Sequence, residues 1–263
     1  GSEVCIIDRG ERPLKGFDAD LVERLVARGE EVGVQLRRRT SLKSIKKDGT
    51  DFLVTVETGS ETKDLRADLV VQGAGRVAAI DQLDLAAANV EAGDKGVAVN
   101  AYLQSTSNPK IYAAGDAADT QGAPLTPVAV FEGKVAASNM LKGNRTKPDY
   151  SGVPSAVFTV PELTRVGMLE QDAREAGHDI RVVENDTSDW YSNLRVGESC
   201  AATKVIIDKD SDTILGAHLL GPEYGEIINF FGLAIRLGLT TSDLKKMVSV
   251  YPSVGSDLGS MLS

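Results

Sequence analysis

The chain has 263 residues, of which 42% are hydrophobic and 25% charged, and this composition predicts a globular protein of about two domains rather than a disordered chain. Its formal net charge of -9 argues against nucleic acid and anionic membranes as partners, because neither attracts an acidic surface. No apolar run approaches the roughly 20 residues of a membrane span, and no signal-peptide pattern opens the sequence, so we expect a cytoplasmic location.

Strand and helix patterns alternate in the N-terminal part of the chain. Residues 3–8 predict a strand in which Cys5 is buried. Residues 20–33 carry apolar side chains at Leu21, Leu25 and Val32, a spacing that favours an amphipathic helix. Further strands are predicted over residues 40–47, 52–58, 63–65 and 68–72, with a tight turn at Asp48-Gly49.

The most informative stretch is residues 111–116, Ile-Tyr-Ala-Ala-Gly-Asp, which predicts a short buried strand ending in Gly115-Asp116. Ligands of open α/β sheets bind at the carboxyl ends of the strands. Gly115 has no Cβ and lets a cofactor approach the backbone, while Asp116 can accept hydrogen bonds from sugar-like hydroxyls. The run Leu-Thr-Pro-Val-Ala over 125–129 follows, and residues 130–141 predict a helix.

Residues 147–152 have the composition of a linker and precede an α+β pattern. The predicted strands cover residues 153–159, 161–167, 180–184, 201–207 and 214–220, and the predicted helices cover 170–177, 223–238 and 241–247. A polar hairpin at 208–213 joins the last two strands. Taken alone, this pattern is also that of a free-standing α+β domain.

These features together resemble the pyridine nucleotide-disulfide oxidoreductases, the family that includes glutathione reductase, dihydrolipoamide dehydrogenase and mercuric reductase. Residues 107–116 match the approach of that family to its flavin, and Thr126-Pro127 stands where the second FAD-binding segment continues. The resemblance implies an α/β plus α+β fold, with partial Rossmann-like nucleotide-binding domains followed by an α+β interface domain. It places a partial NAD(P)-binding domain at 1–76, part of the FAD-binding domain at 77–148 and the interface, or dimerisation, domain at 149–263.

For FAD, the resemblance implies that Asp116 faces the ribityl chain and that Thr126 and the helix start behind it lie near the pyrimidine end of the flavin. A helix N-terminus favours negative charge there. The expected FAD-binding residues are Gly115, Asp116, Thr126, Pro127, Val128 and Ala129.

For the nicotinamide nucleotide, the expected residues are Asp8, Arg9, Lys15 and Arg76. An acidic residue at the end of the second strand commonly holds the ribose of NAD, whereas an arginine there accommodates the phosphate of NADP. Asp8 fits the first role, while Arg9 and Lys15 fit the second and favour NADP. A solvated loop of mixed charge is the alternative for this segment.

Several parts of the family pattern are not present in the sequence. The first strand of the NAD(P) domain with its Gly-x-Gly-x-x-Gly turn, the first half of the FAD domain and the Cys-x4-Cys dithiol are missing, so both cofactor sites are expected to be incomplete. We therefore expect part of a longer enzyme, inactive by itself; a short protein that lost its nucleotide sites is the rival hypothesis. Cys5 and Cys200 do not form a close pair, so neither a metal site nor a redox dithiol is expected.

The C-terminal box departs most from the family. Its members carry His-Pro-Thr with a Glu shortly after, and that His moves protons to and from the dithiol. Here Tyr251 stands at the His position and Ser256 at the Glu position, with Asp257 beside it. Tyr251 is thus a candidate proton donor, with a packing role as the alternative; His178 and His218 are expected to be structural.

The predicted function is an FAD-dependent NAD(P)H oxidoreductase, glutathione-reductase-like, that passes hydride from NAD(P)H to flavin and on to an unidentified small-molecule or small-disulfide acceptor. The alternative is a non-catalytic dimerisation module without bound cofactor. Either hypothesis implies a homodimer through the C-terminal domain. The expected buried surface consists of Leu219, Ile227, Phe230, Phe231 and the Tyr251-Pro252 turn.

Overall fold

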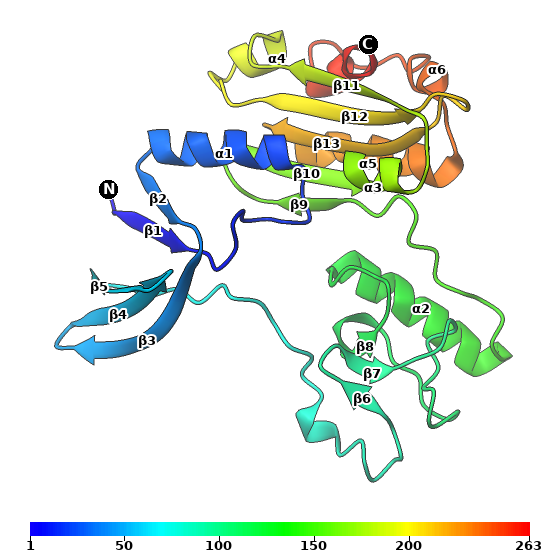
Figure 1. The fold of residues 1–263 in the computed structure, drawn as a ribbon. Helices are drawn as coiled ribbons and strands as arrows, with labels where there is room; N and C mark the ends of the chain where they lie inside the picture. Colours follow the sequence, from blue (N-terminus) through cyan, green and yellow to red (C-terminus); the bar gives the residue numbers. More distant parts are fainter. The chain divides into compact units, whose positions relative to one another are not determined.

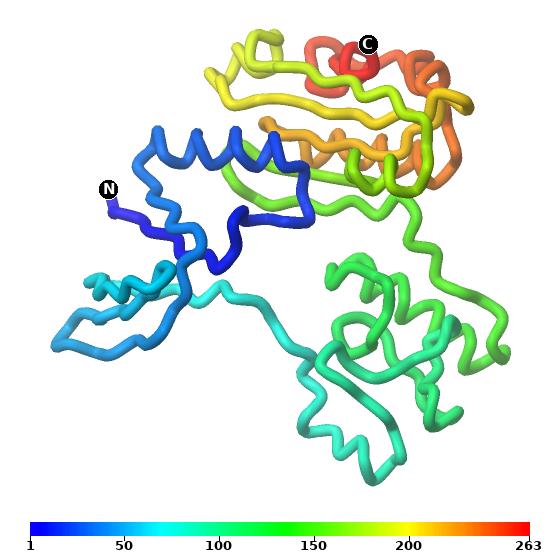
Figure 2. The backbone as a smooth tube through the Cα atoms, viewed as in Figure 1, coloured from blue at the N-terminus to red at the C-terminus, as the bar shows by residue number.

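The computed structural model describes residues 1–263, and the chain divides into two compact units (Figure 1). Unit 1 comprises Gly1–Val71 and Ser151–Ser263, and unit 2 comprises Gln72–Tyr150. Unit 1 is therefore built from two segments that are far apart in the sequence, as the colours of the tube in Figure 2 make clear. None of the helices combines the length and the apolar character needed to traverse a bilayer.

The N-terminal segment of unit 1 begins with a parallel crossover: β1 (Val4–Ile7) pairs with β2 (Val34–Arg37), and α1 (Ala19–Glu31) connects them. The helix begins at Ala19 because the Asp18 carboxylate accepts hydrogen bonds from the amides of Asp20 and Leu21, at 3.1 and 3.2 Å. An antiparallel sheet of β3 (Thr40–Asp48), β4 (Asp51–Thr58) and β5 (Glu61–Ala67) follows.

Unit 2 holds a small sheet, β6 (Ala92–Gly93), β7 (Gly96–Ala98) and β8 (Ala118–Asp119), and the long helix α2 (Thr126–Lys142). The 3-10 turns η1 (Asp81–Leu83) and η2 (Gly115–Ala117) lie between these elements along the chain. The core of the unit is formed by Leu103, Val135 and Ala136. Helix α2 starts earlier than the predicted residues 130–141, because Pro127 fits the first turn, where its missing N–H costs nothing.

Two predicted strands are wrong, because the pairing that each would need is absent or very short. Residues 111–116 form only an isolated bridge, between Gln104 and Tyr112, before the chain turns into η2. Residues 68–72 form no strand, and Leu69 and Val71 are exposed. A strand needs a neighbour to satisfy its backbone groups. Residues 68–72 have none, and residues 111–113 bond to residues 103–105 over too short a stretch to form a strand. The predicted burial of Cys5 is wrong for a related reason, since β1 has β2 as its only partner and is largely exposed.

The C-terminal segment of unit 1 is an antiparallel sheet in the order β11-β12-β13-β10-β9, with α5 (Tyr224–Leu237) packed against β10 and β13. The strands are β9 (Ser155–Val157), β10 (Glu162–Gly167), β11 (Ile180–Asp186), β12 (Ala202–Asp208) and β13 (Ile214–Gly221). The other helices are α3 (Glu170–Glu175), α4 (Tyr191–Leu194) and α6 (Thr241–Leu244), and two 3-10 turns, η3 (Val254–Asp257) and η4 (Ser260–Leu262), end the chain.

Both faces of this sheet are covered. Helix α5 lies on one face and α1 on the other (Figure 1). Side chains alternate along a strand, so Leu219 packs into the core beneath α5 while its neighbour Leu220 packs against residues of α1. Three residues of the expected dimer surface were assigned wrongly. Leu219, Ile227 and Phe231 are buried in the core of unit 1 and are not on its surface. Of that set, Phe230 and the Tyr251-Pro252 turn are exposed.

Candidate functional site

The sequence-predicted FAD residues gather around a depression of about 530 Å³ in unit 2. It is formed where the turn η2 meets the first turn of α2. Its lining consists of Arg76, Ala114, Gly115, Asp116, Ala117, Pro124, Thr126, Ala129 and Val130. Gly115, Asp116, Thr126 and Ala129 are thus brought together as expected. Pro127 is exposed on the same turn and Val128 is buried, and neither lines the depression.

Gly115 allows η2 to approach α2. Its φ of +64° lies in the left-handed region, and a Cβ built on it would be 2.8 Å from the Cβ of Ala129. That separation is far below van der Waals contact, so a larger residue would force the turn and the helix apart.

The buried carboxylate of Glu132, which was not predicted from the sequence, holds η2 against α2. Glu132 is fully buried, and its Oε2 accepts a hydrogen bond from the amide of Gly115 at 2.6 Å. Its Oε1 accepts from the hydroxyls of Thr120 at 2.8 Å and Tyr150 at 2.6 Å. Burial and the bond to Glu132 raise the pKa of Tyr150 to about 12, so its hydroxyl stays protonated and donates at neutral pH. The signal in the sequence was a single acidic residue inside the otherwise apolar start of α2.

Asp116 lines the depression, and its carboxylate is paired with the guanidinium of Arg76. Its side chain is 46% exposed, and its Oδ2 lies 3.0 Å from Nη2 of Arg76. The same nitrogen donates to the carbonyl of Pro124 at 3.2 Å. Arg76, expected to contact the nicotinamide nucleotide, therefore lies among the residues expected to contact FAD.

The first turn of α2 is the second polar feature. The N-cap residue Leu125 provides no side-chain hydrogen bond, and Thr126 is exposed beside it. Amides that lack a capping side chain, together with the helix dipole, favour a negative charge at this point. The depression can thus accept hydrogen bonds from hydroxyl groups at Asp116 and stabilise electron density near Thr126.

The other expected nucleotide residues lie in the loop between β1 and α1 of unit 1. Asp8 is half-buried and its Oδ1 accepts a hydrogen bond from the amide of Gly10 at 2.6 Å, which fixes the start of the loop. Arg9 and Lys15 are exposed and free of ion pairs, so both side chains are available to a phosphate. Arg12 instead donates to the carbonyl of Phe17 at 2.8 Å and shapes the loop.

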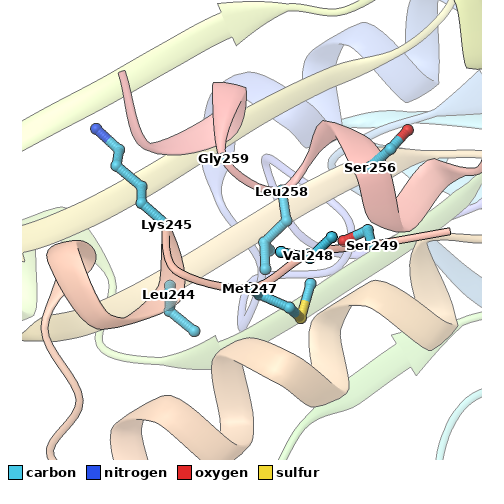
Figure 3. A pocket seen from close by; sticks show the side chains of 8 residues that line it. All are labelled: Leu244, Lys245, Met247, Val248, Ser249, Ser256, Leu258 and Gly259. Atoms are coloured by element: carbon cyan, nitrogen blue, oxygen red, sulfur yellow. The ribbon is translucent and has the colours of Figure 1, made fainter. Parts of the chain in front are cut away.

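Tyr251 lies exposed near the C-terminus, and its hydroxyl has no partner within the chain. Asp257 accepts a hydrogen bond from the hydroxyl of Ser192 at 2.5 Å, and the Ser256 hydroxyl donates to the carbonyl of Ser253 at 2.5 Å. Neither residue takes up the role that Glu has beside the family's His. Close by, a cavity of about 320 Å³ is lined by Leu244, Lys245, Met247, Val248, Ser249, Ser256, Leu258 and Gly259 (Figure 3).

The two histidines hold structural positions. His218 is fully buried with Nε2 at 2.9 Å from the carbonyl of Met168, and burial lowers its pKa. Nδ1 of His178 lies 2.9 Å from the Asp208 carboxylate. Cys200 is half-buried beside the apolar cluster under α1, and burial together with the charge of Glu198 raises its pKa to about 11, which makes it a poor nucleophile.

Two family models match the chain. The model of the pyridine nucleotide-disulphide oxidoreductases matches residues 1–133, and the model of the dimerisation domain of the same family matches residues 153–261.

Similar proteins point in the same direction. A 19.7 kDa protein in the mercuric resistance operon of Staphylococcus aureus is 51% identical over 180 residues, which make up 68% of this chain and 100% of that protein. A mercuric reductase of Bacillus cereus is 32% identical over 98% of this chain and 41% of its own length. A glutathione reductase of Nostoc sp. is 30% identical over 99% of this chain and 59% of its own length. The chain thus spans about half the length of these two enzymes.

Among solved structures, the Cu(II) complex of the HOCl-induced flavoprotein disulfide reductase RclA from Escherichia coli superimposes with a TM-score of 0.88 at 27% sequence identity. The match covers 100% of this chain and 58% of that one. The likeness to the family therefore extends from the sequence to the course of the backbone.

Proposed function

The chain belongs to the pyridine nucleotide-disulphide oxidoreductase family, and we propose that it carries the second FAD-binding segment and the dimerisation domain of an FAD-dependent NAD(P)H oxidoreductase. Residues 1–76 would contribute to the nicotinamide nucleotide domain, 77–148 to the FAD domain and 149–263 to the dimer. The family match and the clustering of Gly115, Asp116, Thr126 and Ala129 around one depression support this proposal. A cytoplasmic location is part of it, because reduced nicotinamide nucleotides are supplied there.

The residues of the depression fit a flavin nucleotide. Asp116 offers an acceptor for hydroxyl groups, and the uncapped start of α2 favours the negative charge of a reduced ring system. FAD, when bound, supplies the transfer of hydride between the nicotinamide and the acceptor. In this proposal Asp116 orients the hydroxyl-bearing chain of the cofactor through Oδ1, while Arg76 pairs with Oδ2.

The loop between β1 and α1 would select the nicotinamide nucleotide. Arg9 and Lys15 offer charge-assisted hydrogen bonds to a 2′-phosphate, which favours NADPH, while Asp8 is already engaged by the amide of Gly10. The acceptor is a small molecule or a small disulfide. Tyr251 is free to donate a proton to it, since its hydroxyl has no intramolecular partner.

The single observation that carries the proposal is the carboxylate of Asp116 at the mouth of the depression, which the substitution Asp116→Ala tests in the native gene product. We expect the purified protein to contain flavin and the variant to lose most of it on gel filtration. Asp119→Ala is the matched control, because Asp119 is an exposed aspartate on the neighbouring strand β8 that does not line the depression. Equal flavin content in Asp116→Ala and the control would contradict the assignment.

One observation favours a second function, a non-catalytic dimerisation module without bound cofactor. The 19.7 kDa staphylococcal relative is matched over its entire length, so a protein similar to this chain and shorter than the family's enzymes exists. A native gene product that is dimeric, contains no flavin and does not oxidise NADPH would establish the module and exclude the oxidoreductase.

A further inference from the structure

Specific contacts within unit 1 join the loop between β1 and α1, here called the nucleotide loop, to the sheet of β9 to β13, here called the dimerisation sheet. The two parts are matched by different family models. Leu21 and Val22 of α1 pack on Leu163 and Leu220 of the sheet, on the face opposite α5. Such apolar contacts hold the helix on the sheet but do not fix its position along the strands, because the hydrophobic effect is not directional.

Lys204 of β12 provides the directional contact. Its side chain is only 5% exposed, and Nζ lies 3.1 Å from Oδ2 of Asp18 and 3.2 Å from Oε1 of Glu184, with a further hydrogen bond to Asp20. Burial opposes the charge of the lysine, but these carboxylates outweigh burial and raise the pKa of Lys204 above its usual range. The Asp18 carboxylate also caps α1, so the cation is linked directly to the start of the helix.

Arg165 of β10 provides a second contact two residues earlier in the loop. Its Nη1 donates a hydrogen bond to the carbonyl of Gly16, and its Nη2 donates to the carbonyl of Gly167 at 2.9 Å. The guanidinium is therefore fixed to its own sheet while it holds Gly16. Arg165 and Lys204 of the dimerisation sheet thus bind the chain at Gly16 and Asp18, on both sides of Phe17.

We propose that Lys204 and Arg165 are positioning residues for nucleotide selection, an inference that rests on the proposed role of Asp8, Arg9 and Lys15. The start of that loop is held by backbone bonds between Asp8 and its neighbours Arg37 and Thr40. Its end is held, at Gly16 and Asp18, by side chains of the dimerisation sheet. Loss of either cation frees the end of the loop and lets Arg9 and Lys15 move away from the phosphate.

Hydrogen exchange on the 263-residue chain tests the contact itself, with Lys204→Met and Asp20→Asn as variants. We expect peptides covering residues 9–22 to exchange about tenfold faster or more in Lys204→Met, because a buried ion pair that loses one partner is strongly destabilised. Peptides from α5 should be unchanged, and Asp20→Asn should show a smaller effect in the same peptides. Lys209→Met is the matched control, since Lys209 pairs with Asp179 on the surface. Unchanged exchange of residues 9–22 in both Lys204→Met and Asp20→Asn would overturn the proposal.

Steady-state kinetics of the native gene product separate positioning from general stability. In Lys204→Met the KM for NADPH should rise about tenfold while kcat stays within about twofold, and Lys204→Arg should restore most of the KM. If Lys204→Met lowers kcat and leaves the KM for NADPH unchanged, Lys204 does not act as a positioning residue. If the wild-type protein does not oxidise NADPH, the proposed function fails, while the exchange experiment still decides whether Lys204 holds the loop.

Discussion

The carboxylate of Glu132 is buried with three hydrogen-bond donors and without an ion-pair partner. A buried carboxylate is tolerated when hydrogen-bond donors satisfy its lone pairs. It also stabilises the surrounding structure, because each donor would be left buried and unpaired without it. The amide of Gly115, the hydroxyl of Thr120 and the hydroxyl of Tyr150 all depend on this one side chain. The shape of the depression at residues 114–117 therefore depends on a residue that does not line it.

Glu132→Ala should lower the free energy of unfolding of unit 2 by about 2–4 kcal/mol, because three donors lose their acceptor in a buried place. Glu132→Gln keeps one oxygen for the amide of Gly115 and should cost about 1 kcal/mol. Urea unfolding of the 263-residue chain, followed by circular dichroism, measures both. Equal losses in the two variants would show that the hydrogen bonds of Glu132 do not hold the turn.

His218 should make the stability of unit 1 sensitive to mild acid. Burial lowers its pKa in the folded chain, with Asp18, Arg165 and Lys204 as the neighbouring charges, so the unfolded chain binds the proton first. Its contribution to stability is complete above the unfolded pKa of about 6.5 and is lost as the pH falls below that value. From pH 7 to 5.5 the wild type should therefore lose more stability than His218→Gln, whose amide can still donate to the carbonyl of Met168. Parallel pH profiles in urea unfolding would refute this account.

At the level of elements, the sequence correctly predicted strands that pair with a neighbouring strand along most of their length. It predicted strands wrongly where the pairing is absent or covers only two or three residues. The hairpins of β3 to β5 and β12 to β13 follow from alternating side chains and polar turns, and they form as expected. Residues 68–72 and 111–116 have equally strong strand composition, but the first stretch has no neighbour to pair with and the second pairs only briefly with residues 103–105. Strand propensity alone does not supply the backbone partners that a strand needs.

The same distinction applies to the candidate site. Gly115, Asp116 and Thr126 could be predicted because they lie close together along the chain and resemble a family motif. Glu132 and the contact of Arg76 with Asp116 could not, since they depend on how α2 and the segment before η1 fold back onto η2. Lys204 was unpredictable for a similar reason, because its partners Asp18 and Asp20 lie far away in the sequence.

At the scale of the whole molecule, the dimerisation-domain match predicts a two-fold dimer formed by residues 153–261. Large apolar side chains are exposed near the C-terminal turn, Val248 at 97% and Tyr251 at 78%, as expected for a surface that a second copy covers. Light scattering of the 263-residue chain at micromolar concentration should therefore give twice the monomer mass. Tyr251→Asp should shift the equilibrium toward monomer, with Tyr191→Asp, at an exposed tyrosine of α4, as a comparison. A monomer mass for the wild type would contradict the predicted dimer.

The proposed flavin-dependent oxidation of NADPH is tested most directly by the visible spectrum of the native gene product, recorded without oxygen before and after addition of NADPH. We expect a bound flavin whose oxidised absorbance band disappears when NADPH is added and returns when an acceptor is supplied. A protein that carries no flavin, or one whose flavin band is unchanged by both NADPH and NADH, would contradict the proposal.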